Sequence, residues 1–230
     1  MPKPFDISQL VSSLSTQKRG DKELLANNTV MSLAARVLAA QFGDELAFPG
    51  KPGSASVSSD VGTANADYDL RTGNMRVSPY ANNNLQTMYM KKDALGGYTG
   101  DFHGNPTTED VLNMVNTLRH ELQHARTNTR GSVAGYPVKS ENITKYLPTG
   151  KNSWDLVSTL QHRALPSMDA TYPLDEFLAT AVPLNTAETK LGPLTRKQQG
   201  YKQEIDQVLF NYPGVSKLIQ DMSRPELFTK

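Results

Sequence analysis

The sequence of 230 residues contains 24 lysines and arginines against 23 aspartates and glutamates, which gives a formal net charge of +1. A nearly neutral chain has no overall field to attract nucleic acid or anionic lipid, and the lack of cysteine excludes disulfides, iron–sulfur clusters, cysteine–zinc sites and thiol catalysis. No run approaches the roughly 20 apolar residues of a membrane span, and the first residues lack the apolar core of a cleavable signal peptide, so we expect a soluble protein.

The first part of the chain is predicted to form an arm, a helix and a loop. Residues 1–20 are polar and predict an N-terminal arm, and residues 21–230 have a length that suits a single domain. Apolar residues recur at helical spacing over 22–42, which predicts a helix. Residues 49–66 are rich in proline, glycine and serine, a composition typical of a surface loop.

The next segment has the pattern of a small sheet. Two short strand-like runs flank a turn at Gly73, so residues 67–78 predict a β-hairpin in which glycine supplies the positive φ. A second strand is predicted over 86–90. The glycine-rich residues 96–106 predict another loop.

A long helix is predicted over 108–128. Thr107 is suited to cap its N-terminus, and Glu109 and Asp110 place negative charge in the first turn, where the helix dipole favours it. Further helices are predicted over 153–165, 173–182, 194–210 and 215–222. We therefore expect an α+β fold, dominated by helices, with a small antiparallel or mixed sheet before the long helix.

The long helix contains a motif that indicates a metal-binding site. His120-Glu121-Leu122-Gln123-His124 has the pattern H-E-x-x-H. Two histidines four residues apart lie one helical turn from each other, so both imidazoles can reach one tetrahedral Zn²⁺ ion. Glu121 then points beside the metal, where it can take a proton from the zinc-activated water as general base and later pass it to a leaving amine.

The periodicity of this helix supports the metal interpretation. Its apolar residues form one stripe, and His120 and His124 fall roughly opposite that stripe. The helix is therefore expected to pack by one face and to line a polar cleft with the other. The alternative is two surface histidines that flank a glutamate by accident, and the scarcity of histidine in this chain argues against it.

At this motif the chain resembles the H-E-x-x-H zinc metallopeptidases, or zincins. The resemblance covers the motif helix and the hairpin before it. It implies one zinc ion per chain and hydrolysis of peptide bonds in a protein or peptide substrate. It also implies that an edge strand of the small sheet, in the hairpin or near residues 86–90, binds extended peptide.

Two histidines leave a catalytic zinc ion one protein ligand short. The metzincin branch would need a glycine at position 127 and a histidine at position 130, where this chain has Thr127 and Arg130, so that branch is excluded. Glu176 is the best candidate, because apolar residues follow it at spacings that pack its helix by the opposite face. Asp175 is the first alternative. His103 and His162 are weaker ones.

The position of Glu176 on a later helix resembles the gluzincin branch. Gluzincins often carry an aspartate four residues after this glutamate, and here that position is Thr180. Orientation of a ligating histidine must then come from Asp175, from Thr180 itself or from a backbone carbonyl. Zincins usually add a tyrosine, histidine or arginine that stabilises the transition state. The eligible residues are Tyr136, Tyr146, Tyr172, Tyr201 and His162, and the sequence does not choose among them.

The run His-Glu-Leu-Gln-His-Ala, followed by Gly131, is similar to the motif helix of compact bacterial effector and toxin metallopeptidases. This resemblance implies export without a cleavable signal peptide, action in a target cell, and a secretion apparatus or a cognate immunity protein as partner. A cytoplasmic protein is the alternative. The alternatives to an endopeptidase are a zinc hydrolase of peptidoglycan peptides and a non-catalytic zinc-stabilised binding domain. Glu121 argues against the last, because a structural zinc site has no use for a general base.

Overall fold

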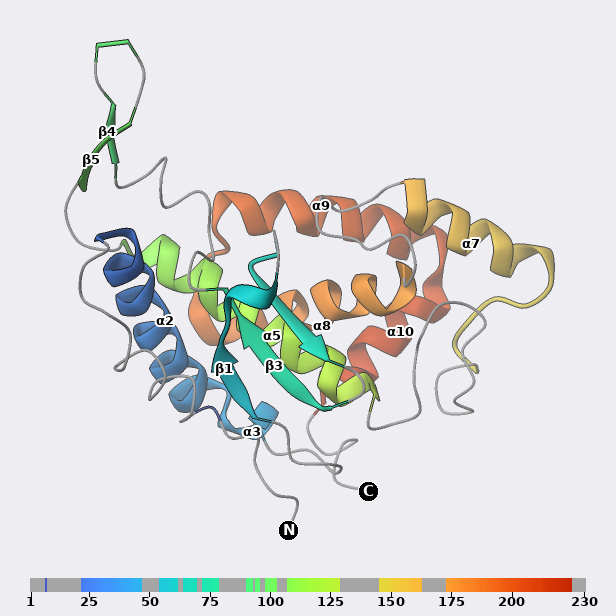
Figure 1. The fold of residues 1–230 in the computed structure, drawn as a ribbon. Coiled ribbons are helices and arrows are strands. Elements are labelled where there is room, and N and C mark those ends of the chain that lie inside the picture. The colour runs from blue at the N-terminus through green and yellow to red at the C-terminus, as the bar shows by residue number, and fades with distance from the viewer. Residues whose placement is uncertain are drawn as a thin grey trace. The chain divides into compact units, whose positions relative to one another are not determined.

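The computed structural model describes residues 7, 22–46, 54–61, 64–69, 72–78, 90–92, 94–95, 98–102, 107–128, 145–162 and 173–224 (Figure 1). They belong to two compact units: Asp44–Lys51 with Arg119–Lys230 and the first four residues form unit 1, and Phe5–Gly43 with Pro52–Leu118 form unit 2. The predicted N-terminal arm, residues 1–20, lies outside the described residues apart from Ile7.

The first helix described in unit 2 is α2 (Lys22–Gln41), which confirms the helix predicted over 22–42. Val30, Ala34 and Leu38 are fully buried along it, as the helical spacing of its apolar residues requires. The N–H of Phe42 donates to the carbonyl of Leu38 at 2.9 Å and closes the last turn. The short helix α3 (Gly43–Leu46) follows, and the boundary to unit 1 falls within it, between Gly43 and Asp44.

A three-stranded mixed sheet forms the next part of unit 2. Its strands are β1 (Ala55–Val57), β2 (Ala66–Asp69) and β3 (Asn74–Val77), in the order β1-β3-β2. The antiparallel pair β2–β3 confirms the predicted hairpin, and Gly73 in its turn has a φ of 76°.

The loop predicted over 49–66 is wrong where β1 and the 3₁₀ turn η1 (Ser59–Val61) lie. β1 pairs in parallel with β3, so the strand depends on a partner distant in sequence. Composition alone does not reveal such a partner, because serine and alanine have no strong preference for strands.

A second, two-stranded antiparallel sheet consists of β4 (Met90–Lys92) and β5 (Tyr98–Phe102). The prediction of a loop over 96–106 is therefore wrong for β5. The glycine in this segment weakens the local preference for a strand, but pairing with β4 stabilises it. Of the strand predicted over 86–90, only Met90 is among the described residues, and it opens β4.

The motif helix α5 (Thr108–Asn128) has the predicted bounds, and the unit boundary falls within it, between Leu118 and Arg119. Its N-terminus is capped as predicted, because Thr107 Oγ1 accepts from the N–H of Asp110 at 3.3 Å. In return, Asp110 Oδ2 accepts from the N–H of Thr107 at 2.7 Å. The two residues thus satisfy each other's backbone donors at the start of the helix.

Unit 1 is helical. It contains α7 (Lys151–His162), α8 (Pro173–Leu191), α9 (Arg196–Asn211) and α10 (Pro213–Met222), all within two residues of the predicted starts. Residues 163–165 of the predicted α7 lie outside the described residues. Helix α8 contacts α7, α9 and α10 (Figure 1), and the apolar side chains of these four helices form one core.

The predicted end of α8 at residue 182 is wrong, because the helix continues through Pro183 to Leu191. An internal proline removes one helical hydrogen bond and usually ends or kinks a helix. Here Leu184 and Ala187 belong to the buried core, so packing of the second half of α8 outweighs that loss.

The described elements give an α+β fold dominated by helices, with a small mixed sheet before the motif helix, as predicted. Among the described residues, no helix combines the length and the apolar character that crossing a membrane requires.

Candidate metal centre

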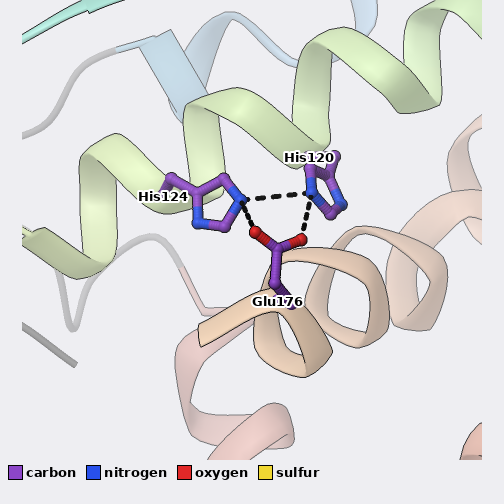
Figure 2. Close-up of side chains that lie close together, drawn as sticks. All are labelled: His120, His124 and Glu176. Atoms are coloured by element: carbon purple, nitrogen blue, oxygen red, sulfur yellow. Dashed lines mark hydrogen bonds and ion pairs between the residues drawn. The ribbon is translucent and has the colours of Figure 1, made fainter. Parts of the chain in front are cut away.

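Within unit 1, α5 and α8 bring His120, His124 and Glu176 together. Figure 2 shows both imidazoles projecting from α5 toward the carboxylate of Glu176, which reaches them from α8. The two Nε2 atoms lie 3.1 Å apart, and Glu176 places Oε2 3.2 Å from Nε2 of His120 and Oε1 3.4 Å from Nε2 of His124. These three side chains could hold a metal ion.

The other ring nitrogen of each histidine, Nδ1, contacts a side chain of α8. Nδ1 of His124 lies 2.8 Å from Oδ2 of Asp175, and Nδ1 of His120 lies 3.2 Å from Oγ1 of Thr180. The hydroxyl of Thr180 donates to the backbone carbonyl of Glu176 at 3.2 Å. The oxygen of Thr180 is thus left to accept from His120, just as the carboxylate of Asp175 can only accept from His124.

These contacts decide which nitrogens carry protons in the neutral imidazoles. Because Asp175 and Thr180 both accept, we infer that both Nδ1 atoms carry hydrogen and that both Nε2 atoms present lone pairs. The two lone pairs and the Glu176 carboxylate then converge on one gap without a donor among them. Such a gap requires a cation, either a metal ion or a proton.

The carboxylates around His124 also favour a positive charge at this site. Burial alone would lower the pKa of His124, but the hydrogen bond to Asp175 and the charges of Glu121, Asp175 and Glu176 outweigh burial and raise its pKa to about 9. At neutral pH the metal-free protein therefore holds a proton on His124. A metal ion must displace that proton in order to bind.

The site keeps access to solvent only at two of its ligands. Between residues 119 and 127 of α5 every residue is buried except His120, and between residues 173 and 184 of α8 every residue is buried except Glu176. Their side chains are 17% and 16% exposed. Water can therefore reach the three ligands from the side of His120 and Glu176.

This burial corrects one expectation. Both ligand helices were predicted to pack only by the faces opposite their ligands, yet the C-terminal half of α5 and most of α8 are buried nearly all round. The periodicity shows only apolar positions, and it misses buried polar side chains such as Gln123 and Thr127, which hydrogen-bond to each other at 3.1 Å.

The remaining predicted site residues occupy different places. Glu121 is buried, and its charge acts on His124. Asp175 contacts Nδ1 of His124 through its carboxylate. It is not one of the three side chains that could hold a metal ion. The hydroxyl of Tyr146 donates to Asp221, and Tyr201 packs against the helical core. His103, Tyr136, Tyr172 and the side chain of His162 lie outside the described residues.

The sequence analysis missed Arg119, which precedes the motif and is 1% exposed. Its guanidinium donates to both carboxylate oxygens of Glu45, at 2.9 and 2.8 Å, and to the carbonyl of Pro183 at 2.7 Å. The helical spacing gave only a weak signal, because position 119 lies at the edge of the apolar stripe, next to Leu122. A charge that is buried at such an edge needs a partner.

Comparisons of the chain with protein-family models, with curated proteins and with solved structures found no match.

Proposed function

We propose that this protein is a zinc-dependent endopeptidase. The observation that carries the proposal is the convergence of two imidazole Nε2 atoms and one carboxylate on a single gap, with both Nδ1 atoms already bound to acceptors. The ligands come from an H-E-x-x-H helix and a later helix, the arrangement expected from the resemblance to zincins of the gluzincin branch.

The donor set favours zinc over other metals. Two nitrogens and one carboxylate are ligands that catalytic zinc sites use, with further positions left for water or substrate. Two ligand atoms about 2.0–2.1 Å from a tetrahedral zinc ion lie about 3.3 Å apart. The 3.1 Å between the two Nε2 atoms is close to this value, and one oxygen of Glu176 lies 3.2 Å from His120 while its other oxygen lies 3.4 Å from His124.

In the proposed reaction His120, His124 and Glu176 would hold a zinc ion, which would act as a Lewis acid toward the scissile carbonyl and the attacking water. Glu121 accepts the proton of the attacking water and passes it to the leaving amine. The Glu121 side chain belongs to a buried residue of the motif helix. Asp175 and Thr180 hold the two histidines in one tautomer and one orientation.

The substrate and the setting of the proposed activity follow from the resemblance alone. We infer an extended segment of a protein as substrate, and a bacterial effector or toxin exported without a cleavable signal peptide as the biological role. The H-E-L-x-H-A run followed by Gly131 supports this inference. A secretion apparatus and a cognate immunity protein are the partners that such a role requires.

The test compares wild-type protein with the Glu121→Gln variant on a mixture of cellular proteins, with detection of new N-termini by mass spectrometry. We expect cleavage by the wild type and a loss of at least about a hundredfold in the variant, because general-base catalysis contributes that much or more. Glu109→Gln, at an exposed glutamate of the same helix, is the control and should retain activity.

Three outcomes would contradict the proposal. Full activity of Glu121→Gln would remove Glu121 from the mechanism. A zinc-loaded wild type that cleaves no protein would contradict an endopeptidase, and release of peptides from peptidoglycan would then indicate a wall hydrolase. Zinc binding without any hydrolysis would indicate a zinc-stabilised binding domain.

A further inference from the structure

Arg119 and Glu45 form a buried ion pair in the unit that contains the three candidate metal ligands. Arg119 precedes His120 in the chain, and its side chain and that of Glu45 are 1% and 10% exposed. The pair is bidentate, with Nε and Nη2 of Arg119 each donating to one oxygen of Glu45. Both residues belong to unit 1, which also contains the three ligands.

Arg119 also connects α5 to α8. Nη1 donates to the carbonyl of Pro183 at 2.7 Å, and Nη2 donates to Oγ1 of Thr186 at 2.6 Å. Pro183 and Thr186 follow Thr180, the residue that orients His120. The guanidinium therefore attaches the motif helix to α8 within two turns of the contact that holds the first histidine.

The contacts between the two helices form a series. Along α5 from Arg119 through His120 to His124, the partners on α8 run backward from Pro183 through Thr180 to Asp175. The helices thus run antiparallel at the site, and Glu176 lies within the stretch that these contacts span. Arg119 fixes one end of the series and Asp175 fixes the other.

From this arrangement we propose that Arg119, held by Glu45, is a positioning residue of the metal centre. It sets the distance and rotation of α5 against α8, and thereby the placement of His120 relative to Glu176. Ligands must be held to within about 0.5 Å for a site of defined geometry. Arg119 suits this task because its planar fork donates to four acceptor atoms on three residues in a fixed geometry, whereas a lysine has three donors on a single nitrogen. The inference rests on the metal-binding part of the proposed function.

The variant that tests this role replaces the ion pair by apolar side chains of similar volume, Glu45→Leu with Arg119→Met. Replacing both charges avoids an unpaired buried charge, which makes such exchanges compatible with folding. The control is Lys190→Met, which removes the exposed contact of Lys190 to Asp44 at 3.2 Å. That contact joins the same segment to α8 and does not involve α5.

The measurements are the zinc Kd, from competition with a chromophoric chelator, and the visible spectrum of the cobalt-substituted protein, which reports coordination geometry. We expect the folded double variant to bind zinc at least about tenfold more weakly, with an altered cobalt spectrum, and the control to match wild type. Arg119→Lys keeps the buried charge and should weaken zinc binding to a smaller extent. It replaces the double variant in the test if the double variant does not fold.

Unchanged zinc affinity and an unchanged cobalt spectrum in a folded double variant, or in Arg119→Lys, would overturn the inference while the proposed function stands. A wild type that binds neither metal would overturn both.

Discussion

Asp175 and His124 form the shortest of the contacts described at the candidate site. Oδ2 of Asp175 lies 2.8 Å from Nδ1 of His124, while Nε2 of the same ring faces Oε1 of Glu176 at 3.4 Å. Asp175 and Glu176 are adjacent in sequence, yet they contact opposite nitrogens of one imidazole. One turn of α8 therefore supplies both a candidate metal-binding carboxylate and the carboxylate that orients a candidate metal-binding histidine.

We expect Asp175→Ala to weaken zinc binding about 10- to 100-fold, the range typical for loss of a carboxylate behind a ligating histidine. Asp175→Asn should weaken zinc binding less than Asp175→Ala does, because the amide oxygen can still accept from Nδ1. A competition titration with a chromophoric chelator measures both. Asp155→Asn, at an exposed position of α7, is the control. Equal zinc affinity in Asp175→Ala and wild type would show that Asp175 does not support the site.

Thr180 gives a second prediction, at the other histidine. Thr180→Val keeps the shape of the side chain but removes the acceptor for Nδ1 of His120, and we expect roughly tenfold weaker zinc binding. Thr180→Ser restores the hydroxyl and should restore most of the affinity. The prediction fails if valine and serine at this position give the same zinc Kd.

The raised pKa of His124 predicts that zinc binding depends on pH. Because its pKa is about 9 in the metal-free protein, zinc must displace a proton at neutral pH. The apparent zinc affinity should therefore rise about tenfold per pH unit between pH 7 and pH 8.5 and level off above about pH 9. Calorimetry at pH 7.5 in buffers of different ionisation enthalpy should detect release of about one proton.

The same shift affects the metal-free fold. A histidine whose pKa is raised from 6.5 to about 9 by folding stabilises the folded state below pH 6.5, and this contribution is lost as the pH rises through about 9. The metal-free protein should become less stable over this range while the zinc-loaded protein does not. Zinc affinity that is independent of pH, with no proton released, would contradict the assignment of His124 as a ligand.

Much of the site could be predicted because its residues follow helical geometry. The spacing of His120 and His124 fixes their relation once α5 forms, and the apolar residues after Glu176 indicate its helix. The sequence also offered Asp175 and Thr180 as residues that could orient the histidines. It did not show that both do so, one behind each ring, because that depends on how two distant helices cross.

The features that the sequence did not reveal depend on tertiary contacts. β1 and β5 form through pairing with other strands, and their serine and glycine content gives no local signal. Helix α8 continues past Pro183 because Leu184 and Ala187 of its second half pack in the core. The partners of Arg119 lie 64, 67 and 74 residues away in the chain, so the helical spacing gives only a weak signal of a buried arginine and none of what it binds.

The central claim is that His120, His124 and Glu176 together hold one zinc ion, and elemental analysis tests it most directly. Purified protein is loaded with zinc, dialysed against buffer with trace zinc, and compared with Glu176→Ala and with Glu188→Ala, an exposed glutamate of the same helix. We predict close to one zinc ion per chain in wild type and in Glu188→Ala, and far less in Glu176→Ala. Wild-type protein without bound zinc, or full zinc retention by Glu176→Ala, would contradict the claim.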